Sequence, residues 1–188
     1  MNLEQELLSE HSRRQADRCA RWVGRDRARF RKLMRIFLKG DGLLARRSAW
    51  VVGICADNAP DLVCPYLGQM IQRMEEPEIH DAVKRNVVRL LQFVEIPPHL
   101  LGRVATICFG YLTSLEVPVA VKANAMTVLA KIARKRPDLA RELRLVVDQQ
   151  LPFAAGAIRA RARQLSKILE STLPPAGVGN KSGKSRLF

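Results

Sequence analysis

The chain has few aromatic residues, and it lacks the long apolar runs and the leader that mark membrane or exported proteins. Only 5% of its 188 residues are aromatic, against 47% that are hydrophobic. No uncharged apolar stretch approaches the roughly 18 residues that cross a bilayer as a helix. The first 15 residues lack the basic start and apolar run of a signal peptide. We therefore expect a cytoplasmic protein whose core packs Leu, Val, Ile and Ala between helices.

Metal-binding and catalytic motifs are also missing. The four cysteines are separated by 36, 9 and 44 residues, and the three histidines form no zinc-type spacing. We expect reduced thiols that behave as small buried hydrophobes, with no metal and no cofactor. No glycine-rich phosphate loop, nucleophile elbow or HExxH motif is present. His80 and Asp81 could form an acid–base pair, but a helix start with acids at its positive end explains them better.

Carboxylates are scarce relative to basic residues. The chain holds 32 Lys and Arg against 18 Asp and Glu, a net charge of +14. Half of that excess lies in residues 1–49, with 13 basic and 6 acidic side chains. Such a charge favours acidic proteins, nucleic acid or anionic surfaces, and it selects none of them by itself.

Helical periodicity runs through the chain, with proline and glycine at the breaks. We predict a leading basic helix within residues 1–25 and four helical pairs at 26–58, 61–95, 98–136 and 138–170. The segment 171–188 is rich in Pro, Gly, Ser and Lys, and we expect a disordered basic tail. The predicted helices are 3–22, 26–39, 43–58, 61–75, 79–95, 98–115, 118–136, 138–150 and 155–170.

The second helices of these pairs repeat one pattern. Their opening basic residues, Arg46, Lys84, Lys122 and Arg159, are 38, 38 and 37 residues apart. Apolar residues align at i, i+4, i+7 and i+11 from the residue before each of them, which makes one buried stripe per helix. A fixed period of this length is typical of a solenoid whose units bury their apolar faces against their neighbours.

A two-helix unit of about 38 residues, opened by Val83-Lys84, Val121-Lys122, Ile158-Arg159 and the related Ala45-Arg46, resembles the HEAT repeat. Residues 22–169 are most similar to small stand-alone bacterial HEAT-repeat proteins. The resemblance implies an all-α fold: a right-handed α-solenoid of about four HEAT-like pairs plus a leading N-terminal helix, an armadillo-like superhelix. Some members of that group carry the name adenylosuccinate lyase. We reject that activity, since the chain is too short and has no Ser-rich catalytic loop.

The recurring basic column is the first candidate site. In HEAT repeats the equivalent residue typically pairs with an acid in the preceding turn, and acids lie five or six residues upstream of the first three copies. We expect a structural ladder between repeats rather than a polyanion site. Its members are Arg46, Lys84, Lys122 and Arg159 with Asp41, Glu78 and Glu116.

A second candidate is the row of residues that face away from the core on the second helices. In a solenoid this row lines the concave surface. It is basic to polar, centred on Arg85 and Arg89, and contains no carboxylate and no aromatic residue; a solvated helix face would look similar. The row comprises Arg47, Val51, Arg85, Arg89, Gln92, Thr127, Gln164 and Lys167.

A third candidate is a basic stripe at i+4 steps on the helix 26–39, made of Arg27, Arg31, Arg35 and Lys39. Guanidinium groups bind phosphate and carboxylate bidentately, although an outer helix needs a polar face in any case. Trp22 and Trp50 stand alone on apolar faces, and we expect both in the core.

These features favour a non-enzymatic scaffold that binds another protein, most simply an acidic one, through its concave face. The alternative is a nucleic-acid-binding protein that uses its basic surface. A DNA-glycosylase-like repair enzyme is a distant third, because it would need an acid and aromatic residues in the concavity.

Overall fold

The computed structural model describes residues 1–40, 42–134, 136–150, 152 and 156–170, with the side chains of all of these except 157 and 166–170. This part is an all-α solenoid, and no strand occurs in it. The predicted tail, 171–188, lies outside the described residues. The helices are α1 (Leu3–Ser9), α2 (Arg13–Val23), α3 (Arg27–Lys39), α4 (Gly42–Asn58), α5 (Leu67–Met74), α6 (Asp81–Leu91), α7 (Pro98–Thr113), α8 (Val119–Ala133), α9 (Pro137–Gln150) and α10 (Gly156–Glu170), with 3₁₀ turns at Pro60–Leu62 and Cys64–Tyr66.

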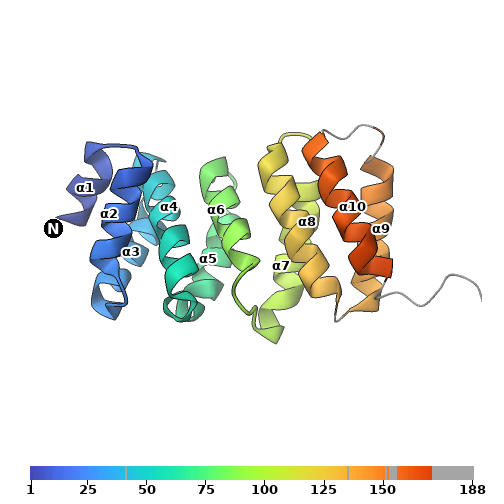
Figure 1. Ribbon diagram of the computed structural model, residues 1–188, viewed down its shortest axis with the longest axis horizontal. Helices are drawn as coiled ribbons and strands as arrows, with labels where there is room; N and C mark the ends of the chain where they lie inside the picture. Colours follow the sequence, from blue (N-terminus) through green and yellow to red (C-terminus); the bar gives the residue numbers. More distant parts are fainter. Residues whose placement is uncertain (41, 135, 151, 153–155, 171–188) are drawn as a thin grey trace, which may run out of the picture.

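The helices form two layers. Helices α2, α4, α6, α8 and α10 lie side by side in the nearer layer of Figure 1, and α3, α5, α7 and α9 stand behind them. We call the nearer layer the inner row. Each inner helix packs against its own outer partner and against the next inner helix, so the core is continuous from one end of the stack to the other. No helix in the described part is both long and apolar enough to cross a membrane.

The repeated apolar columns are buried as predicted. Their small members, Ala49, Ala125 and Ala162, are at most 2% exposed. Small side chains at this level allow neighbouring helix backbones to approach closely, while the larger members fill the space above and below. The other described members are buried as well: Ala45, Val52, Ala56, Val83, Val87, Leu90, Val94, Val121, Val128, Ile132, Ile158 and Leu165.

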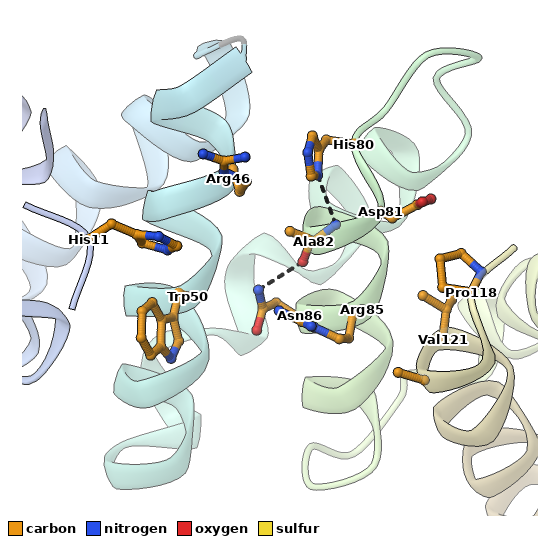
Figure 2. A pocket seen from close by; sticks show the side chains of 11 residues that line it. His11, Arg46, Trp50, His80, Asp81, Ala82, Arg85, Asn86, Pro118 and Val121 are labelled. Atoms are coloured by element: carbon orange, nitrogen blue, oxygen red, sulfur yellow. Dashed lines mark hydrogen bonds between the residues drawn. The ribbon is translucent and has the colours of Figure 1, made fainter. Parts of the chain in front are cut away.

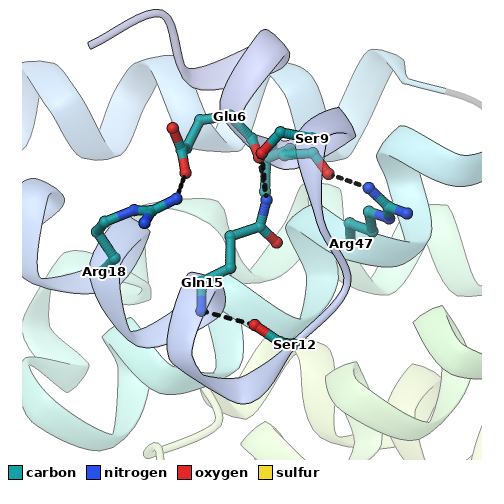
Figure 3. A network of polar contacts seen from close by, with 7 residues as sticks. Glu6, Ser9, Ser12, Gln15, Arg18 and Arg47 are labelled. Atoms are coloured by element: carbon teal, nitrogen blue, oxygen red, sulfur yellow. Dashed lines mark hydrogen bonds and ion pairs between the residues drawn. The ribbon is translucent and has the colours of Figure 1, made fainter.

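The single leading helix predicted at 3–22 is wrong, because the structure contains two. Glu10 is extended after α1, and Ser12 begins α2 by accepting a hydrogen bond from the Gln15 backbone N–H at 3.1 Å. This is one half of the Ser-x-x-Gln capping box. The Gln15 side chain is buried and donates to the Ser9 hydroxyl at 3.2 Å and to the Glu6 carbonyl (Figure 3). The Ser12 cap and the buried Gln15 amide therefore stabilise a turn between α1 and α2, at a place where apolar periodicity alone predicts a continuous helix.

The predicted helix 61–75 also begins later than expected. Two 3₁₀ turns precede α5; Pro60 is the first residue of one and Pro65 the second residue of the other. Proline has no backbone N–H and clashes with the preceding turn of an α-helix. Regular helix therefore begins at Leu67.

The ends of the outer helices are bonded by the next repeat. Arg73 on α5 donates to the carbonyl of Gly40, which follows α3. The Tyr111 hydroxyl on α7 donates to the carbonyl of Met74 at 2.9 Å, and Gln150 on α9 donates to that of Leu112 at 2.8 Å. The last carbonyls of a helix have no partner within the helix. One polar side chain per repeat supplies it here.

Lys131 performs the same task in the inner row. From α8 its ammonium donates to the carbonyls of Leu91 at 3.2 Å and Gln92 at 3.1 Å, and also to that of Val94. These carbonyls lie at and just beyond the end of α6. A single cation therefore holds the C-terminal end of one repeat to the following one.

Replacing Lys131 with Met should destabilise the fold by about 1–3 kcal/mol, because half-buried carbonyls lose their donor. Thermal or urea unfolding followed by circular dichroism measures the loss. Lys122→Met is the matched control, because Lys122 is a half-buried lysine on the same helix whose side chain has no hydrogen-bond or ion-pair partner in the described part. Equal stability of the two variants would show that the carbonyl contacts of Lys131 contribute nothing.

The cysteines should differ sharply in reactivity. Cys19, Cys55 and Cys108 are buried, and Cys64 is exposed. Burial raises the pKa of Cys55 and of Cys108 to about 12, and it also raises the pKa of Cys19.

A raised pKa means less thiolate, so at pH 8 a thiol of pKa 12 is ionised in on the order of one molecule in ten thousand. We expect iodoacetamide at pH 8 to modify Cys64 in the folded protein and all four cysteines in denaturant, as measured by mass spectrometry. Rapid native labelling of Cys55 or Cys108 would contradict the packing described above.

Candidate binding site on the inner helices

The row predicted to line the concave surface divides into structural and free residues. Arg47 belongs to the structural group, because it is half-buried and donates to the carbonyl of Leu7 at 2.6 Å. Figure 3 shows its guanidinium directed at the end of α1. Val51 is buried. The prediction that Arg47 and Val51 face a partner is wrong, because α1 packs over this part of α4.

Further along the row, polar side chains join one repeat to the next. Arg89 forms an ion pair with Asp57 at 2.7 Å, and its guanidinium lies 5.6 Å from the centre of the Phe93 ring. Gln92 donates to Asn124 at 2.9 Å, which connects α6 to α8. Thr127 donates to a carbonyl of its own helix. These predicted contact residues therefore have partners inside the molecule.

Arg85 is different. It is exposed, and its side chain has no hydrogen bond or ion pair within the described residues. Gln164 is also exposed, and it accepts a hydrogen bond from Arg161 at 3.4 Å. The side chain of Lys167 lies outside the described part. Arg85 is thus the predicted row member with a guanidinium available to a partner.

Arg85 lines a pocket of about 400 Å³ that extends across α6 from α4 to the start of α8 (Figure 2). The second and third turns of α4 and the first two turns of α6 line it, the start of α8 lies at one end, and His11 enters from the turn between α1 and α2. The lining residues are His11, Arg46, Trp50, His80, Asp81, Ala82, Arg85, Asn86, Pro118, Ala120 and Val121.

The pocket carries unbalanced positive charge. Within the described residues, the Nε of Arg46 is buried without an acceptor and Arg85 has no partner. Asp81 is the one carboxylate among the lining residues, and it already forms an ion pair with Lys84 at 3.2 Å. The arrangement therefore suits an anionic group from outside.

His80 and Asp81 have structural roles here. The Nδ1 of His80 accepts a hydrogen bond from the backbone N–H of Ala82 at 3.0 Å and so caps α6. Asp81 lies in the first turn, where the helix dipole favours a negative charge. This agrees with the helix-start interpretation of the pair.

Sequence reasoning missed Trp50 and His11. Trp50 is half-buried: it packs against the core and also lines the pocket, where the His11 ring meets it edge-on at 5.4 Å and 80°. The predicted row contains no aromatic residue and no acid, whereas the pocket beside Arg85 is lined by one of each, Trp50 and Asp81. Trp50 could have been found, because it lies one turn after Arg46 on the same helix face. His11 had no signal, since its turn was predicted as helix.

The ladder of basic residues pairs differently from the prediction. Lys84 binds Asp81, three residues upstream, and not Glu78, which is exposed. Its ammonium also lies 5.9 Å from the centre of the Tyr111 ring. The predicted pair of Lys122 with Glu116 does not occur in the described part, and Asp41 lies outside it. Arg159 is exposed.

The reason is visible in the alignment of the repeats. Positions 43, 119 and 156, which correspond to Asp81, hold Leu43, Val119 and Gly156. The other three basic residues therefore have no acid one helical turn before them.

The basic stripe is on the outer layer. Arg27, Arg31, Arg35 and Lys39 are all exposed on α3, and none has a carboxylate partner within the described residues. The opposite face of α3 buries Phe30, Leu33, Met34 and Phe37. The stripe and the pocket are therefore on different layers of the solenoid. No group of three or more His, Cys, Asp or Glu side chains able to hold a metal ion occurs in the described part.

Comparison with known proteins agrees with this architecture. The sequence profile of the HEAT repeat domain matches residues 3–168, which is most of the chain. No curated protein and no solved structure gives a match. The narrower likeness to stand-alone bacterial members stays a prediction. The profile match, together with the stacked helical pairs, shows that the chain belongs to the HEAT repeat family.

Proposed function

We propose that this protein is a non-enzymatic binding scaffold, which holds an acidic segment of another protein along the inner row. HEAT repeats commonly form scaffolds for protein interactions, and the stacked surface of a solenoid is where repeat proteins hold extended partners. The observation that carries the proposal is Arg85, an exposed guanidinium that lines a pocket and has no partner among the described residues.

The distribution of ion pairs supports an acidic partner. Ten carboxylates of the described part are already paired with Arg or Lys. On α4 and α6 these include Asp57, bound to Arg89, and Asp81, bound to Lys84. A carboxylate-rich segment approaching Arg85 would therefore meet no unpaired carboxylate on these two helices. Complementary potential of this kind accelerates association and selects partners.

Reversing the charge of Arg85 tests the proposal. The protein is immobilised and used to capture partners from lysate of its native cell, with nuclease treatment to remove bridging nucleic acid. The affinity of the strongest purified partner is then measured for three proteins: wild type, Arg85→Glu and Arg31→Glu. We expect Arg85→Glu to weaken binding by about tenfold or more, because a repelling charge replaces an attracting one.

Arg31→Glu is the control, since Arg31 is also an exposed arginine, on the outer layer. Both variants should melt within about 1 °C of wild type, because neither side chain has an internal partner. Equal loss of binding in the two variants would reject the inner row as the contact surface.

The alternative, nucleic-acid binding, is favoured by the stripe on α3. Arg31, Arg35 and their neighbours project four unpaired cations from one helix face. Contacts with phosphates release counterions, so affinity should fall steeply between about 50 and 200 mM salt. A mobility shift of duplex or single-stranded DNA at low salt, lost in Arg31→Glu/Arg35→Glu, would support this alternative. No shift at low salt would reject it. Release of an alkylated base from DNA is the assay for the glycosylase hypothesis.

A further inference from the structure

We propose that the pocket between α4, α6 and α8 is a binding site for a phosphate monoester. The inference deepens the proposed function, because it names the group by which an acidic partner would be held. The phosphate site stands on the pocket alone, whereas its assignment to a partner protein rests on the proposed function.

Two guanidinium groups supply the charge that a phosphate dianion needs. Arg46 extends from the first turns of α4, with its Nε buried and lacking an acceptor. Arg85 extends from α6 and has no partner in the described part. Lys84 compensates Asp81 at 3.2 Å, so the nearby carboxylate does not cancel the arginines. Guanidinium groups that have no internal partner can bind phosphate oxygens through parallel hydrogen bonds.

The start of α8 adds backbone donors. Pro118 precedes this 15-residue helix and cannot cap it with a side-chain hydrogen bond. The N–H of Ala120, which lines the pocket, has no acceptor in the described part. The start of α6 is different, because His80 and Asp81 already occupy it. An uncapped helix start in the lining of the pocket favours a phosphate through its free N–H groups and its partial positive charge.

These donors suit a phosphate better than a carboxylate. A phosphate monoester has three terminal oxygens and close to two negative charges near neutral pH, so it can accept hydrogen bonds from several donors of the pocket lining. A carboxylate has two oxygens and one charge, so it satisfies fewer of these donors. The pocket volume of about 400 Å³ also leaves room for the group that carries the phosphate, beside the Trp50 ring.

The two tryptophans provide a reporter and an internal control. Trp50 lines the pocket, whereas Trp22 is on α2, where the Arg29 guanidinium covers its ring at 5.0 Å. We would titrate ¹⁵N-labelled protein with phenyl phosphate at constant ionic strength and follow both indole N–H signals by NMR, assigning them with Trp22→Phe. Phenyl phosphate should shift the Trp50 signal saturably and leave Trp22 unchanged. Benzoate, the matched carboxylate, should bind at least about tenfold more weakly.

Arg85→Ala should weaken the binding of phenyl phosphate by about tenfold or more, and Arg31→Ala should bind it as wild type does. Arg46→Lys is the second variant, which keeps the charge but loses the fork of donors, and it should weaken phosphate more than benzoate. Three results would overturn the proposal: a Trp50 signal that does not shift, equal affinity for phenyl phosphate and benzoate, or wild-type affinity of Arg85→Ala for phenyl phosphate.

Two further probes distinguish the source of the phosphate. Tighter binding of an acidic phosphoserine peptide than of inorganic phosphate and AMP assigns the site to a phosphorylated partner, and the reverse order assigns it to a free small phosphate. If phenyl phosphate shifts the Trp50 signal but no protein partner depends on Arg85, the phosphate site is supported and the scaffold function is rejected. If a protein partner depends on Arg85 but phenyl phosphate causes no shift, the scaffold function is supported and the phosphate site is rejected.

Discussion

The carbonyl groups at the ends of helices are the constraint on which this solenoid depends. A helix leaves its last carbonyls without partners, and a short helix has few other groups to compensate. Here the donor comes from one repeat further along: Arg73, Tyr111 and Gln150 in the outer layer, and Lys131 in the inner row. Together with the continuous apolar core, these bonds make each repeat complete only when the next one is in place.

This constraint divides the basic residues into two groups. Arg89, Arg103 and Lys131 bind groups of neighbouring repeats. Arg103, for example, donates to Glu75 at 2.6 Å, and this hydrogen bond lowers the pKa of the Glu75 carboxyl. Arg85 and the stripe on α3 have no such task. These five cations therefore carry charge that no contact within the described residues uses, and a binding role for them costs the fold little.

Repetition in the sequence was sufficient to predict the architecture but not the roles of single residues. Arg47 and Arg85 occupy equivalent positions, 38 residues apart, and the pattern alone cannot separate them. In the structure Arg47 donates to the end of α1, whereas Arg85 is exposed in the described part. The hydrogen bonds across the outer layer also follow the repeat period, because their donors Arg73, Tyr111 and Gln150 are 38 and 39 residues apart. The sequence could in principle have predicted them. The three donors are different residue types, so their equivalent positions are not apparent from the sequence.

The sequence by itself determined the helical pairs, their period and the buried columns, because apolar spacing dictates which face of each helix leaves water. It also determined the exposed stripe on α3. Only the tertiary structure decided the corner between α1 and α2, the partner of Lys84, and the pocket that joins Arg46, Trp50, Arg85 and His11. The physical reason is distance along the chain: a helix face follows from neighbours three or four residues away, whereas a pocket is made where three helices and a turn from separate repeats converge.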